Sequence, residues 1–77
     1  MNENDLLSKI EINPKIMFGK PVIKGTRMPV ELVLEKLAYG QSADDLMKEY
    51  PFLTEEDIKA SLLYASRVIS MEEIVFV

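Results

Sequence analysis

The chain of 77 residues contains neither cysteine nor histidine. The lack of cysteine excludes disulfides and thiolate metal ligands, and the lack of histidine excludes imidazole as a metal ligand or as a general acid or base. No apolar run approaches the roughly 20 residues of a membrane span, and the first residues form no apolar signal core. We therefore expect a cytoplasmic protein with no metal, no cofactor, no catalytic residues and no membrane segment.

Glycine is also scarce, and two of the three glycines stand in one basic stretch before the first clear helix pattern. Gly19 and Gly25 could belong either to a phosphate-binding loop or to a tight turn flanked by solvated lysines. The order and spacing fit neither GxxxxGK[ST] nor GxGxxG, the two loops that cradle phosphates. We therefore interpret Gly25 as a bend that needs a positive φ angle.

The net charge of −4 is distributed unevenly along the chain. Between Leu6 and Val30, five basic residues stand against Glu11 alone, which leaves this part at +4. From Glu31 onward, ten carboxylates outnumber four basic residues, which leaves −6. A basic front and an acidic back indicate two surfaces for two partners, and the acidic part favours a basic protein. Ordinary variation of surface charge is the alternative.

Apolar periodicity predicts the first helix at about residues 29–39. Pro29 suits the first position of a helix, and Gly40 suits the position just after its end. An apolar stripe with helical spacing lies between them and consists of Val30, Val33, Leu34, Leu37 and Ala38.

Two further helices are predicted at about residues 43–50 and 55–70, with Ser42 and Thr54 as their N-caps. Carboxylates follow each cap, where the helix dipole favours anions. Adjacent helical residues point about 100° apart, so these carboxylates do not converge on one ligand. We therefore interpret them as parts of the helix starts and expect no enzyme.

The third predicted helix carries apolar residues on two sides. The stripe expected to face the core consists of Ile58, Leu62, Ala65 and Ile69. Off this stripe lie Leu63, Tyr64 and Val68. Because two apolar sides exceed what one small core needs, these three residues are candidates for a homodimer interface.

The rest of the chain is expected to form short strands. A basic arm at about residues 8–28 precedes the helices. The strands expected in it are Ile10–Ile12 and Pro21–Ile23. The last residues, about 73–77, favour β-structure and predict a C-terminal strand that pairs with the arm, within the chain or across a dimer. Ile74 and Phe76 of this strand are further candidates for the dimer interface.

The order of these elements predicts a mainly α single domain over residues 1–77, with the second and third helices as a helix-turn-helix pair. Docking of the third helix in the major groove is disfavoured, because it opens with three carboxylates that repel phosphates. The candidate DNA contacts are cations, mostly from the basic arm: Lys20, Lys24, Arg27 and Lys59. For Arg27, a salt bridge to a helix carboxylate is the alternative.

Two segments give the sequence a family resemblance. The first is G-x-P-x-I-x-G-T-R-x-P-V, at Gly19, Pro21, Ile23, Gly25, Thr26, Arg27, Pro29 and Val30. The second is Y-P-x-L-T-x-x-D-I, at Tyr50, Pro51, Leu53, Thr54, Asp57 and Ile58. Over about residues 13–66 the chain resembles the bacterial and archaeal domain-of-unknown-function family 433. Asn13 and the Met17-Phe18 pair depart from the pattern of that family.

The resemblance implies a homeodomain-like three-helix fold with a short β-element. It also implies an antitoxin of a toxin–antitoxin pair, which dimerises, binds its own promoter DNA and sequesters a PIN-like ribonuclease toxin. It supplies no catalytic residues. The alternative is a dimeric protein-interaction module that does not bind DNA, and salt-sensitive binding to the upstream DNA would separate the two hypotheses.

Overall fold

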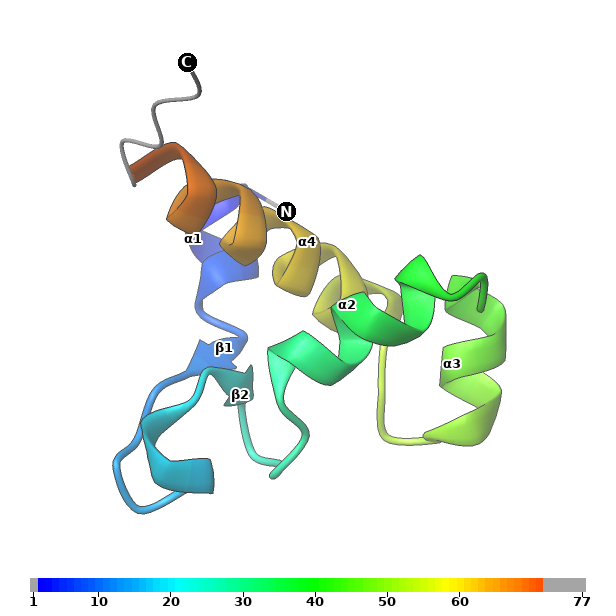
Figure 1. The fold of residues 1–77 in the computed structure, drawn as a ribbon, viewed down its shortest axis with the longest axis horizontal. Coiled ribbons are helices and arrows are strands. Elements are labelled where there is room, and N and C mark those ends of the chain that lie inside the picture. The colour runs from blue at the N-terminus through cyan, green and yellow to red at the C-terminus, as the bar shows by residue number, and fades with distance from the viewer. Residues whose placement is uncertain (1, 72–77) are drawn as a thin grey trace.

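In the computed structural model, which describes residues 2–71, most of the chain is helical (Figure 1). The elements in chain order are α1 (Glu3–Leu7), β1 (Ile10–Glu11), the 3₁₀ turn η1 (Met17–Gly19), β2 (Val22–Ile23), α2 (Val30–Ala38), α3 (Ala43–Glu49) and α4 (Glu55–Met71). The predicted mainly α class with a small sheet is confirmed. The strand predicted at residues 73–77, with Ile74 and Phe76, lies outside the described residues.

An N-terminal helix, α1, precedes the basic arm and was not predicted. It begins after Asn2, whose side-chain oxygen accepts a hydrogen bond from the Asp5 N–H at 2.9 Å. Arg67 of α4 forms an ion pair with Glu3 of α1. The two helices are therefore in contact, and α1 lies against the C-terminal part of α4 (Figure 1).

The two strands β1 and β2 form a short antiparallel pair. The opposed residues are Ile10 with Ile23 and Glu11 with Val22. After β2 the chain bends at Gly25, which has a φ of 80°, and runs back so that the Ile23 N–H donates to the Met28 carbonyl at 2.9 Å. Before β2, Met17 and Phe18 have φ values of 49° and 58°, in a region that side-chain-bearing residues rarely adopt.

Reciprocal capping boxes begin α3 and α4. The Ser42 hydroxyl accepts from the Asp45 N–H at 3.1 Å, and the Asp45 carboxylate accepts from the Ser42 N–H at 2.9 Å. Thr54 and Asp57 make the same pair of hydrogen bonds, at 3.1 and 3.0 Å. These bonds satisfy N–H groups that a helix start otherwise leaves unpaired, so these two carboxylates have structural roles.

The hydrophobic core lies where α4 meets the other elements. Helix α4 contacts α1, α2, α3 and β1 (Figure 1). The buried core cluster consists of Ile23, Met28, Val30, Val33, Leu46, Leu53 and Ile58. On α4 itself, the buried residues are Asp57, Ile58, Ala60 and Ser61.

The predicted core stripe of α4 is wrong at two positions. Leu62 and Ile69 are 50% and 63% exposed. Helix α4 is longer than the core, and beyond Ser61 no element within residues 2–71 fully covers this side of it. Periodicity identifies an apolar face but not how far along the helix the core extends.

Candidate functional site

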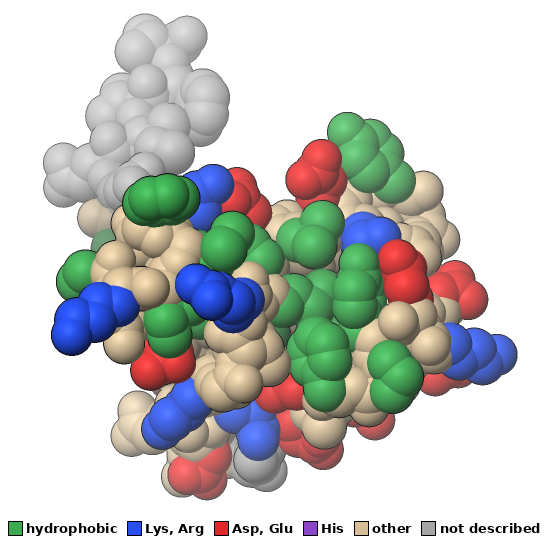
Figure 2. All heavy atoms as spheres, turned by 90° about the horizontal axis from the view of Figure 1, so that it is seen from below, with side chains coloured by type: hydrophobic (Ala, Val, Ile, Leu, Met, Phe, Trp, Pro, Cys, Tyr) green, Lys and Arg blue, Asp and Glu red, His purple; other side chains and the backbone are tan. Residues whose placement is uncertain are grey.

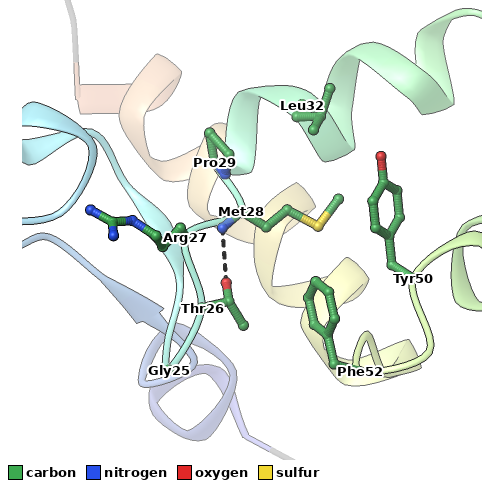
Figure 3. Close-up of a pocket in the computed structure, with 8 residues that line it drawn as sticks. All are labelled: Gly25, Thr26, Arg27, Met28, Pro29, Leu32, Tyr50 and Phe52. Carbon is green, nitrogen blue, oxygen red and sulfur yellow. Dashed lines mark hydrogen bonds between the residues drawn. The ribbon is translucent and has the colours of Figure 1, made fainter.

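An apolar hollow of about 570 Å³ opens between the turn that leads into α2 and the turn that joins α3 to α4. It is lined by Gly25, Thr26, Arg27, Met28, Pro29, Leu32, Tyr50 and Phe52 (Figure 3). The Met28 side chain extends toward the rings of Tyr50 and Phe52, whereas the Arg27 side chain points away from the other lining residues (Figure 3). We call this site the 25–52 hollow.

The wall formed by the turn before α2 is held in place by Thr26. The Thr26 hydroxyl donates to the Ile23 carbonyl at 2.7 Å and accepts from the Met28 N–H at 3.0 Å. Both functions of this hydroxyl are therefore used within the wall. Arg27, which is exposed, is the one charged side chain among the lining residues.

The opposite wall is aromatic and is tied to α2. The ring centroids of Tyr50 and Phe52 are 6.0 Å apart, with the rings tilted by 59°. The Lys36 ammonium lies 5.5 Å from the centroid of the Tyr50 ring and forms an ion pair with Glu49 at 2.9 Å. The hydrogen bond to Glu49 raises the pKa of Lys36, and the same bond lowers the pKa of Glu49. These contacts fix the aromatic wall relative to α2.

A second apolar surface is the outer side of α4, which we call the α4 outer face. It consists of Leu62 and Ile69, which lie on the same side of the helix and are 50% and 63% exposed. Val68 and Met71 are also exposed, at 38% and 82%, but they lie about 120° and about 180° around the helix from Leu62. A groove of about 220 Å³ beside it is lined by one charged residue, Glu31, and by the apolar or aromatic residues Pro21, Val30, Leu34, Tyr64, Ala65, Val68 and Ile69. Between Leu62 and Met71 the one charged residue is Arg67, and it is paired with Glu3.

The residues predicted for a dimer interface divide between two environments. Val68 is exposed and lines the groove beside the α4 outer face. Leu63 and Tyr64 are half-buried, and Tyr64 packs against the core of its own chain. The exposed apolar residues of α4 are thus partly those that periodicity assigned to the core.

The four cations predicted to contact DNA differ in their availability. The ion pairs are Lys20 with Glu31 at 2.6 Å and Lys59 with Glu55 at 3.6 Å. Lys24 and Arg27 form no ion pair within residues 2–71, so the alternative salt bridge of Arg27 is not found in that part of the chain. Lys24 lines a separate, polar hollow of about 300 Å³ together with Ser8, Lys9 and Asp57.

Within the described residues, no group of three or more acidic, histidine or cysteine side chains could hold a metal ion. The same part of the chain contains no helix that is both long and apolar enough to cross a membrane.

The 25–52 hollow was missed by sequence reasoning. One signal was present in the sequence: two aromatic residues, Tyr50 and Phe52, stand on either side of Pro51. Aromatic residues in a turn do not contribute to the buried face of a helix, so they call for another explanation. Figure 2 shows hydrophobic side chains gathered in the middle of the face seen from below, with several Lys and Arg side chains to one side of them. Recognising this patch requires the two turns to be placed next to each other.

Three comparisons connect the chain to known proteins. A family model described as a protein of unknown function, DUF433, matches residues 10–65. The uncharacterized protein y4eO of Sinorhizobium fredii (strain NBRC 101917 / NGR234) is 37% identical over 65 residues, a match that covers 80% of this chain. The chain spans only 29% of the length of that relative.

A solved structure matches most of this chain. The crystal structure of a DUF433 member protein from Anabaena variabilis ATCC 29413 superposes with a TM-score of 0.77 at 29% identity, covering 88% of this chain and 67% of that chain. The family model spans both motif segments and most of the helical core. On these grounds the chain belongs to the DUF433 family.

Proposed function

We propose that this protein is the antitoxin of a toxin–antitoxin pair, which acts as a homodimer and sequesters a protein toxin of the PIN-like ribonuclease class. The observation that carries the protein-binding part is the α4 outer face. Ten successive residues, Leu62 to Met71, contain one charge, and that charge is paired with Glu3. An exposed apolar surface with few charges on an acidic chain is typical of a protein–protein contact.

A second copy of the chain fits this face. Leu62 and Ile69 are seven residues apart, which is about two helical turns, so they lie on the same side of α4. Antiparallel packing of two α4 helices would place Leu62 of each copy beside Ile69 of the other, as a two-fold interface requires. Because this surface carries few charges, two copies can meet there without bringing like charges into contact, while each chain keeps its net charge of −4.

The toxin part of the proposal is supported by the family resemblance and by the charge of the second half of the chain, at −6 from Glu31 onward. A basic partner protein suits this charge. The homeodomain-like helix-turn-helix arrangement of α3 and α4 belongs to the same proposal.

DNA binding by the same dimer is the second candidate function. It is favoured by Lys24 and Arg27, which form no ion pair within residues 2–71. The N-terminus of α4 is unsuited to base reading, because Glu55, Glu56 and Asp57 occupy its first turn. DNA contact would therefore come from the basic arm and would be directed to phosphates.

The dimer is tested by light scattering of the full chain at micromolar concentration. We expect a dimer, and Ile69→Asp should convert it to a monomer because the substitution places a charge in the interface. Tyr39→Asp is the matched control, since Tyr39 is 81% exposed and lies outside the α4 outer face. A monomeric parent protein, or a dimer that survives Ile69→Asp, would contradict the proposed interface.

The antitoxin function is tested by coexpression with the protein encoded by the adjacent gene. We expect a complex that survives purification and suppresses ribonuclease activity of that protein. If the two proteins do not associate, or if the ribonuclease remains active in the complex, the antitoxin proposal is wrong.

DNA binding is tested with the upstream DNA over a series of salt concentrations. Lys24→Ala combined with Arg27→Ala should weaken binding equally at all sequences and lower the salt slope by roughly one unit per lost contact. Lys15→Ala, at another exposed cation of the arm, should have a smaller effect. A parent protein that shows no salt-dependent binding supports the interaction module that does not bind DNA.

A further inference from the structure

We propose that the 25–52 hollow is a docking site for an amphipathic helix of a partner protein, which inserts two apolar side chains and places a carboxylate against Arg27. This inference goes beyond the proposed function, because neither dimerisation through α4 nor DNA binding uses the apolar walls of the hollow; Arg27 is the one lining residue that also belongs to the DNA-binding candidate. Three properties of the site carry it: its apolar walls, its one cation, which forms no ion pair within residues 2–71, and the hydrogen bonds that the Thr26 hydroxyl makes within the wall.

The walls fit apolar anchor side chains. The volume of about 570 Å³ falls within the range of about 300–1,000 Å³ that is usual for ligand pockets, and it exceeds what a single side chain fills. Phe52 in the aromatic wall is 51% exposed, so a large apolar ring is left in solvent at the rim of the hollow. Burying it under a partner removes this apolar area from water.

The charge of Arg27 favours a carboxylate next to the apolar side chains of the bound helix. Arg27 is exposed, lines the hollow and forms no ion pair within residues 2–71. A guanidinium can hold a carboxylate through two parallel hydrogen bonds, which fixes the direction of the bound segment. Because the Arg27 side chain points away from Tyr50 and Phe52, the carboxylate is expected outside the apolar walls, at one end of the segment, and the apolar anchors at the other end (Figure 3).

The hydrogen bonding of the loop wall favours a helix over an added strand. An added strand needs a row of free backbone N–H and C=O groups on its partner. Here the Met28 carbonyl accepts from the Ile23 N–H and the Met28 N–H donates to Thr26, whose hydroxyl also donates to the Ile23 carbonyl. A helix satisfies its own backbone, so it can present apolar side chains to this wall without leaving polar groups unpaired.

A nucleic-acid base stacked on the aromatic wall is the competing occupant. Aromatic rings beside an arginine also suit single-stranded nucleic acid. Here the chain carries a net charge of −4, and α4 opens with Glu55 and Glu56 shortly after Phe52. Phosphates next to these carboxylates would be repelled, so the protein helix is favoured.

The test is a titration of the isotope-labelled full chain with three helical peptides of equal length, followed by amide NMR signals. The first peptide carries two leucines one helical turn apart and a neighbouring glutamate, the second has lysine in place of the glutamate, and the third has serines in place of the leucines. The first should shift the signals of Gly25 to Met28 and of Tyr50 and Phe52, with a Kd below about 1 mM. The lysine peptide should bind at least about fivefold more weakly, and the serine peptide should not bind.

Variants of the lining residues sharpen the test. Phe52→Ala should weaken the glutamate peptide about tenfold, whereas Phe18→Ala, at a residue that is 98% exposed elsewhere, should leave binding unchanged. Arg27→Glu should reverse the preference toward the lysine peptide, and Lys15→Glu should not. Both charge reversals are at exposed positions, so they test the site without disturbing the core.

Several results would overturn the proposal. Signal shifts from the glutamate peptide that are confined to the α4 outer face, or no shifts at about 1 mM peptide, would contradict it. Equal affinity for the glutamate and lysine peptides would remove the role of Arg27. Displacement of the peptide by micromolar oligodeoxythymidine would assign the hollow to nucleic acid instead.

Discussion

Asp57→Ala should lower the free energy of unfolding by about 2 kcal/mol, because it removes one half of the capping box at the start of α4. The Asp57 carboxylate is largely buried and accepts a hydrogen bond from the Thr54 N–H at 3.0 Å. A hydrogen bond to a charged acceptor contributes about 1.5–3 kcal/mol. The other half of the box uses the Asp57 backbone N–H and remains in the variant.

Glu56→Ala is the matched control, since Glu56 is an acidic residue in the same helical turn. It is exposed and forms no ion pair within residues 2–71, so only its interaction with the helix dipole is lost, at about 0.5 kcal/mol. For a chain of this size, Asp57→Ala should lower the Tm by about 10 °C and Glu56→Ala by only about 3 °C. Thermal melts followed by circular dichroism measure the Tm differences, and urea denaturation measures the differences in the free energy of unfolding.

Two outcomes would refute this reasoning. Equal losses for the two variants would show that the carboxylates act only through the dipole. Asparagine keeps the shape of aspartate and an oxygen that can accept the hydrogen bond from the Thr54 N–H. If Asp57→Asn lowered the free energy of unfolding as much as Asp57→Ala, that hydrogen bond would not be the source of the stability. The role assigned to Asp57 is structural, so its amide variant should keep the fold.

Leu46→Ala should cost about 2–5 kcal/mol because Leu46 is fully buried, whereas Leu62→Ala, at a residue that is 50% exposed, should cost less than about 1 kcal/mol; urea denaturation measures both. Acid should destabilise the protein. The hydrogen bond that the Ser42 N–H donates lowers the pKa of Asp45 below its usual 3.8, and the hydrogen bond from the Lys36 ammonium lowers the pKa of Glu49 below its usual 4.5. The stability that these two carboxylates contribute is therefore present above their usual pKa values and is lost as the pH falls through the lower folded-state pKa values. The double variant with Asp45→Asn and Glu49→Gln should show a flatter dependence of stability on pH in that range. Gly25→Ala should cost about 1 kcal/mol in thermal melts, because its φ is 80° and no atom would obstruct the added Cβ, and Gly25→Asn should cost less.

The helices were predictable because their signals are local. The capping pairs Ser42 with Asp45 and Thr54 with Asp57 lie three residues apart, so the sequence alone brings the bonding groups together. Helix α1 carried the same kind of signal, an Asn cap followed by acidic residues, and it was overlooked because the segment is short.

The core boundary was less predictable. The stripe on α4 has helical spacing throughout, but burial ends at Ser61, and Leu62 and Ile69 are left exposed. Helical spacing is a property of one element, whereas burial depends on which other elements reach it.

The sequence by itself determined the family, the mainly helical class, the bend at Gly25 and the lack of cysteine and histidine chemistry. These follow from residue identity and from interactions between near neighbours. Only the tertiary structure decided that the turn at Gly25–Pro29 meets the turn at Tyr50–Phe52, that Arg27 remains unpaired within residues 2–71 while Lys20 does not, and that the outer side of α4 stays open. The physical reason is that a hollow, an ion pair between distant residues and an uncovered face are each set by the packing of segments far apart in the chain, which no local pattern encodes.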